Sequence, residues 1–159
     1  MDFTLPADLA TLKDEVDAFV RDEIIPFETD PRWTAHGPTD ALRRDLNDKA
    51  RTAGLLAIHS PTEYGGRGLS HFAKAVVFEA AGYSILGPVA LHCQAPDEGN
   101  IHLLAEVGSA AQKERFLKPL ASGETRSCFA MTEPHPGAGA DPGLLKTRAT
   151  PDGNGWVIS

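Results

Sequence analysis

Apolar side chains recur at helical spacing through most of this chain. Leu9, Leu12 and Val16 share one side of residues 7–25, charged side chains occupy the other, and Pro26 is expected to end the helix. This pattern is typical of an amphipathic helix packed on a core. The same reasoning predicts further helices over residues 40–53, 70–82, 88–94, 98–107 and 109–121.

The connections between these helices are rich in turn-forming residues. Residues 26–38 contain three prolines and one glycine and are predicted to form a loop. Asp40 is expected to cap the helix that follows, and Gly54 stands where that helix should end. Ser109 is expected to cap the last helix, with Gln112 in its third position.

The spacing of apolar residues changes from a helical to a strand-like pattern after the last predicted helix. Residues 126–131, 145–149 and 156–159 are predicted to be strands, and the Pro, Asp, Gly and Asn residues of segment 151–155 predict a turn. The fold class is therefore mainly α, an α+β arrangement in which a helical bundle precedes the first strands of a β-barrel or β-sandwich domain. We place the all-α domain at residues 1–124 and the beginning of the β-domain at residues 125–159.

The β-portion is expected to be incomplete. Residue 159 falls inside a predicted strand, and two or three strands cannot cover both faces of a sheet, so this portion should be marginal without additional chain. Two interpretations follow from this: the sequence is part of a longer protein, or it is a subunit that another chain completes.

Composition narrows the function class. With 42% apolar and 23% charged residues the chain has the balance of a globular protein, and its 22 acidic against 15 basic residues give a net charge of -7. The basic pair at positions 43 and 44 lies among aspartates, which argues against a nucleic-acid surface. Two cysteines without C-x-x-C spacing favour a cytoplasmic location, and no targeting segment or membrane span is visible.

The segment 128–141 has the composition of a ligand-binding loop. An apolar run leads into Pro134, Pro136, Gly137 and Gly139, and the segment closes on an acid. Glycines let a backbone approach a bulky ligand, and successive N–H groups in such loops form anion-binding concavities. The pattern is weak alone, since it is neither a Walker loop nor a Rossmann fingerprint, and a plain turn beside core-filling residues would show the same composition.

The same segment resembles the flavin loop of the acyl-CoA dehydrogenases. Phe-Ala-Met-Thr-Glu-Pro at 129–134, followed by Gly-Ala-Gly-Ala-Asp at 137–141, matches that family's signature. Residues 61–68 are similar to its loop between early helices, residues 108–124 to the helix that leads into its β-domain, and residues 95–100 to one branch of the family. These matches are collinear and cover the whole chain.

The resemblance implies an FAD site. Phe129, Met131 and Thr132 would line the flavin, and Gly139 and Ala140 would face the phosphates. The acid that follows, Asp141, would hold the loop.

Two features of the loop depart from the family pattern. The insertion His135–Pro136 lengthens the loop, and alanine at position 140 replaces the usual serine, which removes one hydrogen-bond donor. Contacts to the pyrophosphate at this position are therefore expected to come from backbone N–H groups.

The resemblance also implies an acyl-CoA substrate. Cys93, Ala95 and Gly99 would wall the acyl-chain channel, although helix packing uses small residues in the same way. Histidine, cysteine and acids gather between residues 92 and 102, but their spacing is interrupted by proline and glycine, so we expect no metal site. His36, His59, His71 and His135 fall in or near loops, and we interpret them as solvated or capping histidines.

No catalytic residue is expected within these 159 residues. Glu63, Glu133 and Asp141 lie nearest to the loop and have structural explanations, while the family's catalytic glutamate has no counterpart in the sequence. By resemblance the complete enzyme would desaturate an acyl-CoA thioester at the α,β position, pass electrons to an electron-transferring flavoprotein and form a homotetramer. This chain alone is expected to be inactive. The alternative function is a non-catalytic flavin- or acyl-CoA-binding subunit that docks on a full-length homologue.

Overall fold

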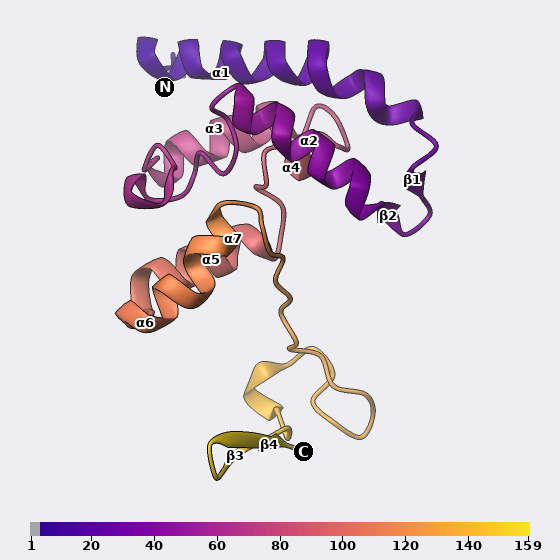
Figure 1. Cartoon of the computed structure of the whole chain (residues 1–159), viewed down its shortest axis with the longest axis vertical. Helices are drawn as coiled ribbons and strands as arrows, with labels where there is room; N and C mark the ends of the chain where they lie inside the picture. Colours follow the sequence, from indigo (N-terminus) through magenta and orange to yellow (C-terminus); the bar gives the residue numbers. More distant parts are fainter. Residues whose placement is uncertain (1–3) are drawn as a thin grey trace. The chain divides into compact units, whose positions relative to one another are not determined.

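A computed structural model describes residues 4–159, and the chain divides into two compact units at Ser127–Cys128 (Figure 1). Residues 1–3, on which the expected lack of a targeting segment partly depends, lie outside the described residues. Within the described part, none of the helices combines the length and apolar character that crossing a membrane requires.

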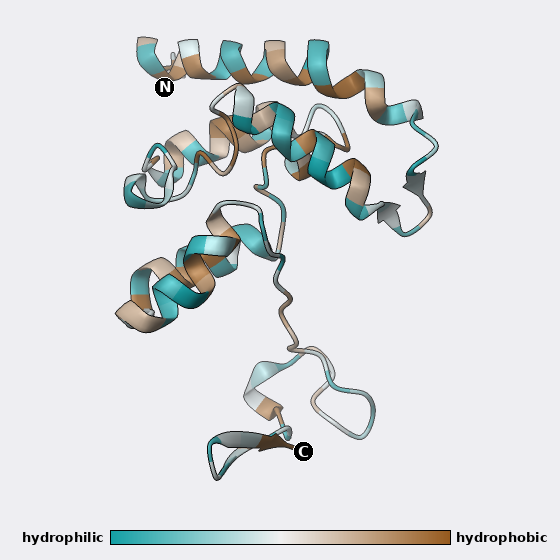
Figure 2. Ribbon diagram, in the orientation of Figure 1, coloured by the Kyte–Doolittle hydropathy of each residue, from teal (hydrophilic) through white to brown (hydrophobic). Residues whose placement is uncertain are grey.

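The first α-helix continues into a wider π-helical turn and then a tighter 3-10 turn. Helix α1 spans Ala7–Phe19, runs on as a π-helical turn over Val20–Ile24 and ends in a 3-10 turn over Ile25–Thr29. The helix predicted over residues 7–25 is present, but helical turns continue to Thr29, past Pro26, which was expected to end the helix. Pro26 lies in the first turn of the 3-10 segment, where the missing N–H costs no hydrogen bond. Brown and teal residues alternate along α1 in Figure 2, in keeping with one face that packs on the core and one that is polar.

The predicted loop at residues 26–38 contains a small hairpin. Strands β1 (Trp33–Thr34) and β2 (Gly37–Pro38) pair antiparallel. Helix α2 follows over Asp40–Thr52, and its cap is Thr39, whose hydroxyl accepts the N–H of Leu42 at 3.3 Å. The predicted cap at Asp40 is wrong, because the backbone is extended at Thr39 and already helical one residue later.

The other predicted helices are present with adjusted bounds. Ser70 caps α3, and Ser109 opens its helix with a capping box that includes Gln112, as expected. The helix predicted at 88–94 is shorter, because His92 adopts a left-handed φ of 55° that a helix cannot continue through. The elements are η3 (Thr62–Tyr64), α3 (His71–Ala81), α4 (Gly87–Ala90), α5 (Asp97–Val107), α6 (Ala110–Gln112), η4 (Lys113–Leu117) and α7 (Lys118–Ala121).

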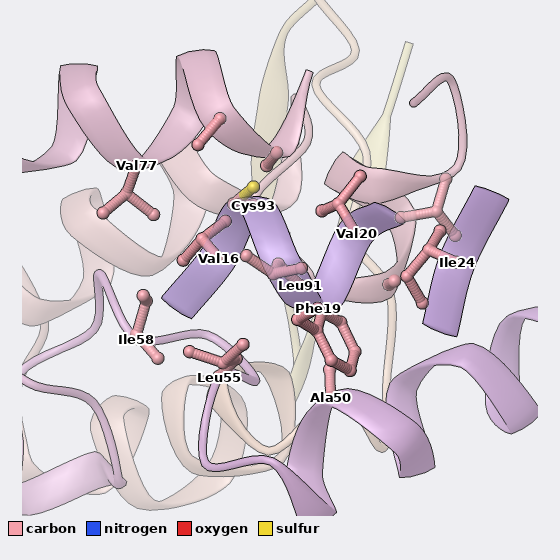
Figure 3. Packing of buried hydrophobic residues seen from close by; sticks show 14 of the residues in the cluster. Val16, Phe19, Val20, Ile24, Ala50, Leu55, Ile58, Val77, Leu91 and Cys93 are labelled. Carbon is pink, nitrogen blue, oxygen red and sulfur yellow. The ribbon is translucent and has the colours of Figure 1, made fainter. Parts of the chain in front are cut away.

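The helical unit has a main core and a smaller one. Buried side chains from α1, α2, α3 and α4 form the main cluster, part of which Figure 3 shows from close by. The second cluster consists of Ile101, Leu117, Leu120 and Ala121. A buried polar contact links the two, since Nε2 of His92 lies 2.8 Å from the carbonyl oxygen of Leu120. Helices α2 and α4 are joined by Asn47, which donates to the carbonyl oxygens of Val89 and Ala90.

The second unit contains one antiparallel hairpin. Strands β3 (Ala149–Asp152) and β4 (Gly155–Ile158) pair around a turn at Gly153, preceded by a 3-10 turn over Pro142–Leu144. All residues of both strands are exposed. The predicted turn is confirmed, whereas the strand predicted at 145–149 begins only at its last residue.

The strand predicted over residues 126–131 is wrong. None of these residues pairs with another strand in the described part of the chain, and an apolar run forms a strand only when a neighbour completes the ladder. The fold class itself is confirmed: a helical bundle precedes the first short strands of a second unit.

Candidate flavin loop

Glu133 organises the Gly/Pro loop from inside. Its carboxylate accepts the N–H groups of Ala138 at 2.8 Å, Lys146 at 3.0 and 3.1 Å, and Thr147 at 2.5 Å. Among residues 128–159 it is the one classed as buried. The loop thus folds around an anion that the protein itself supplies.

These hydrogen bonds fix the charge state of Glu133. Bonds from Thr147, Ala138 and Lys146 stabilise the ionised form and lower the pKa of Glu133 from 4.5 to about 2. A carboxylate that is ionised at all physiological pH values and surrounded by backbone donors is poorly suited to take up a proton. The geometry therefore gives Glu133 a structural role.

A single backbone bridge brings the two halves of the predicted flavin site together. The N–H of Glu133 donates to the carbonyl oxygen of Gly139 at 3.0 Å, and the two residues form an isolated antiparallel bridge. Thr132 and Ala140 are the neighbours of these paired residues. Gly139 has a φ of +60°, and no atom lies within 4 Å of the position that a Cβ would take there. The loop is open at this point, as close approach of a ligand requires.

Gly137 has a different reason to be glycine. A Cβ at this position would lie 2.6 Å from the Cβ of Glu133 and 2.7 Å from the carbonyl oxygen of Pro134. The lack of a side chain at Gly137 therefore lets the loop close on Glu133, whereas at Gly139 the space remains free.

The backbone donors of the loop are largely committed to the protein. Gly137 donates to Pro134 at 2.6 Å, Ala138 to the Glu133 carboxylate, and Asp141 to the carbonyl oxygen of Ala138 at 3.2 Å. Asp141 also accepts the N–H of Gly143 at 2.9 Å, a hydrogen bond at the end of the loop. Of the N–H groups from 137 to 141, those of Gly139 and Ala140 have no hydrogen-bond acceptor in the described part of the chain.

The side chains expected against the flavin lie at the surface of their unit. Phe129 is 66% exposed, Met131 is half-buried, and Thr132 and Ala140 are exposed. An exposed phenylalanine offers a surface that a flat aromatic ligand can cover. The assignment of these residues to a flavin stays a prediction.

The three residues expected along an acyl channel are in two different environments. Cys93 is 8% exposed and lies inside the main core, where Figure 3 shows its sulfur among apolar side chains of the cluster. Burial raises the pKa of its thiol to about 12, so the group behaves as a small apolar side chain. Ala95 and Gly99 are exposed near the start of α5, with open space around Gly99.

Both histidines and one of the two acids between residues 92 and 102 have partners within the protein. His92 contacts Leu120, and the ring of His102 lies edge-on to that of His71 with 5.6 Å between centroids. Asp97 accepts hydrogen bonds from Arg126 and Ser127. In the described part of the chain no three His, Cys, Asp or Glu side chains are grouped to hold a metal ion.

His59 lies in a loop as predicted, but its interpretation as a solvated or capping histidine is wrong. It is 3% exposed, lies edge-on to Phe78, and neither ring nitrogen has a hydrogen-bond partner among the described residues. Burial, together with the nearby Lys74 charge, lowers the pKa of His59 from 6.5 to about 3, so the ring is neutral near pH 7. The signal for this was present in the sequence, because His59 directly follows the apolar run from Leu55 to Ile58.

Comparison with known proteins decides the family. The profile of the acyl-CoA dehydrogenase N-terminal domain matches residues 6–124. This chain belongs to the acyl-CoA dehydrogenase family.

Curated relatives agree with this assignment. FadE2 of Mycobacterium tuberculosis, an acyl-CoA dehydrogenase by name, is 32% identical over 166 residues, which cover 100% of this chain and 40% of the relative. The (R)-benzylsuccinyl-CoA dehydrogenase of Thauera aromatica is 32% identical over 169 residues, or 100% of this chain and 41% of that protein. The chain thus spans about two-fifths of the length of these two dehydrogenases.

Solved structures of the family share the fold. A Mycobacterium abscessus protein assigned to the acyl-CoA dehydrogenases superposes with a TM-score of 0.81 at 35% identity, over 98% of this chain and 41% of that one. Glutaryl-CoA dehydrogenase from Mycobacterium smegmatis gives a TM-score of 0.72 at 29% identity, over 98% of this chain and 38% of that one. The family resemblance of the sequence is confirmed.

Proposed function

We propose that this chain provides the N-terminal helical domain and the flavin loop of an FAD-dependent acyl-CoA dehydrogenase that introduces an α,β double bond into an acyl-CoA thioester. The observation that carries the proposal is the bridge between Glu133 and Gly139, which places the two halves of the flavin signature side by side in a member of this family. The relatives favour this function over that of a non-catalytic docking subunit.

The residues present fit FAD. Phe129 and Met131 offer apolar surface to the flavin ring, Thr132 offers a hydroxyl, and the open backbone at Gly139–Ala140 offers an N–H group to a phosphate. When bound, FAD supplies the hydride acceptor for the β-carbon. The chain's own contribution is to hold and shield the cofactor, with the N–H groups of Gly139 and Ala140 as the backbone donors that remain uncommitted.

The acyl group is proposed to lie along the start of α5. Ala95 and Gly99 are exposed there and carry no bulky side chain, while Cys93 supports this segment from the core. The base that removes the α-proton is proposed to lie outside these residues, since backbone donors occupy the carboxylate oxygens of Glu133 and its lowered pKa makes it a weak base. We further propose a cytoplasmic homotetramer that passes electrons to an electron-transferring flavoprotein, and no activity for the 159 residues alone.

Flavin affinity of the full-length enzyme tests the loop. Asparagine at Gly139 adds a side chain at a φ of +60° that asparagine tolerates better than other residues, so backbone strain is kept small. Gly153 is the matched control, because its φ is +57° and its Cβ position is equally open, but it lies in the β3–β4 turn. We expect Gly139→Asn to weaken FAD binding by about tenfold or more, and Ala140→Ser to preserve it.

The control variant distinguishes a lost approach to FAD from a general effect of asparagine at a left-handed glycine position. Gly153→Asn should leave the FAD dissociation constant unchanged, as measured by fluorescence titration of the apoprotein. If Gly139→Asn binds FAD as tightly as the control variant, the loop does not approach the cofactor and the proposed function loses the observation that carries it.

A further inference from the structure

Asp97 holds the segment that leaves the helical unit. It is the first residue of α5, its side chain is fully buried, and its carboxylate takes three hydrogen bonds from two consecutive residues. Arg126 Nε donates at 2.5 Å, while the backbone N–H and the hydroxyl of Ser127 each donate at 2.7 Å. One acid therefore fixes both the backbone and the side chains of this segment.

Ser127 is fixed from a second direction. Its hydroxyl donates to Asp97 and accepts from the side-chain amide of Asn100 at 2.9 Å, so the orientation of the hydroxyl is determined on both sides. Asn100 lies about one turn further along α5. Residues 126 and 127 belong to no helix or strand, so side-chain contacts of this kind hold them on the helical unit.

The energetics make this contact hard to replace. A carboxylate withdrawn from water is strongly unfavourable unless charge and hydrogen bonds compensate it. Burial by itself would raise the pKa of Asp97, but the hydrogen bonds from Ser127 and Arg126 outweigh it and lower the pKa. Its place at the amino end of α5 favours the negative charge as well. The side chain is thus committed to Arg126 and Ser127.

We propose that Asp97 is a positioning residue for the flavin loop. It anchors Ser127, the residue directly before Cys128, and thereby gives Phe129, Met131 and Thr132 a fixed starting point. A segment whose preceding residue is already fixed has less conformational freedom to lose when the cofactor binds, which raises affinity. This inference depends on the proposed function, because it assigns the anchored segment to an FAD site.

The test compares FAD binding in variants of the full-length enzyme. Asp97→Asn keeps the shape of the side chain and removes its charge, and we expect about tenfold weaker FAD binding. Ser127→Ala removes one hydroxyl and keeps the Asp97–Arg126 pair; we expect about fivefold weaker binding. Glu98→Gln is the matched control, one residue along the same helix, and should bind FAD as the wild type does.

The readouts separate positioning from stability. FAD affinity is measured well below the unfolding temperature, together with hydrogen exchange of the Ser127 amide, which should become faster in Asp97→Asn. If Asp97→Asn does not fold, Ser127→Ala decides the matter. Should the folded variants unfold more easily yet bind FAD with wild-type affinity, Asp97 only stabilises the helical unit and the inference is wrong. If the wild-type enzyme itself binds no FAD, the proposed function fails and this inference fails with it.

Discussion

Different interactions stabilise the two units of this chain. In the helical unit, apolar side chains from four helices are buried in a shared core, including Val16, Leu42 and Leu46 at 0% exposure. In residues 128–159, the side chain classed as buried is the carboxylate of Glu133, and both strands of the hairpin are exposed. One unit has a hydrophobic core, whereas the other has a hydrogen-bonded loop.

This difference implies unequal stability. Full burial of a leucine-sized side chain contributes about 1.5–3 kcal/mol, while an ordinary hydrogen bond contributes a net of about 1 kcal/mol. A two-stranded hairpin without a covered face is marginal in water. We therefore expect the helical unit to determine the unfolding of this chain, and residues 128–159 to contribute little to it.

The largest expected effect comes from opening the helical core. Leu46 lies on α2 and is fully buried, so Leu46→Ala should lower the free energy of unfolding by about 2–5 kcal/mol. Val157 is the contrasting aliphatic residue on β4, 50% exposed, and Val157→Ala should change stability by less than about 0.5 kcal/mol. Urea unfolding followed by circular dichroism measures both.

The contrast between these two variants is the decisive quantity. If Val157→Ala destabilises the chain as much as Leu46→Ala does, the hairpin belongs to the same cooperative unit as the helices, and the two units are not stabilised in different ways.

The helices could be predicted from sequence because their information is local. Apolar periodicity identified α1, α2, α3 and α5, and Ser109 with Gln112 identified a helix start from two residues three positions apart. The strand at 126–131 could not be judged in this way, because a strand exists only with a partner and pairing is not encoded locally. The neutral, buried His59 was missed for a related reason, since burial depends on Phe78 and other distant neighbours.

The site was predictable to the extent that it is a contiguous signature. Phe129 to Ala140 were found by resemblance, and the structure adds why Gly137 and Gly139 differ. The Asp97 contact was missed because its partners lie 29 and 30 positions further along the chain. In the sequence, Asp97 was one acid of the cluster at residues 92–102, for which we expected no metal site, and part of the family match at residues 95–100.

The second prediction concerns acid sensitivity of the helical unit. Because the pKa of His59 is lowered to about 3 in the folded state, the unfolded state binds this proton first as the pH falls below 6.5. Stability should therefore be intact above that value and decline on acidification, with a loss of about 2 kcal/mol by pH 5 from His59. His59→Leu should abolish this part of the loss, as measured by urea unfolding at neutral pH and at pH 5.

A surface histidine provides the control for this measurement. His36 lies exposed between β1 and β2, and His36→Leu should leave the pH dependence of unfolding as it is in the wild type. Equal acid sensitivity in His59→Leu and the wild type would mean that His59 is not kept neutral by burial.

The smallest effect on global stability is expected at Glu133, although its local effect should be clear. Glu133→Gln retains the size of the side chain but replaces a charged acceptor by an amide with a single oxygen, so the N–H groups of Ala138, Lys146 and Thr147 lose part of their bonding. Their amide exchange should accelerate roughly tenfold, while the unfolding of the helical unit stays unchanged.

In the wild type the protection of these amides should be present above pH 4.5 and be lost as the pH falls through about 2, since the pKa of Glu133 is lowered in the folded state. Glu124→Gln, at an exposed glutamate before this unit, should change neither quantity. A drop in global stability comparable to that of Leu46→Ala would show that this carboxylate supports the whole chain, and the division into two differently stabilised units would have to be abandoned.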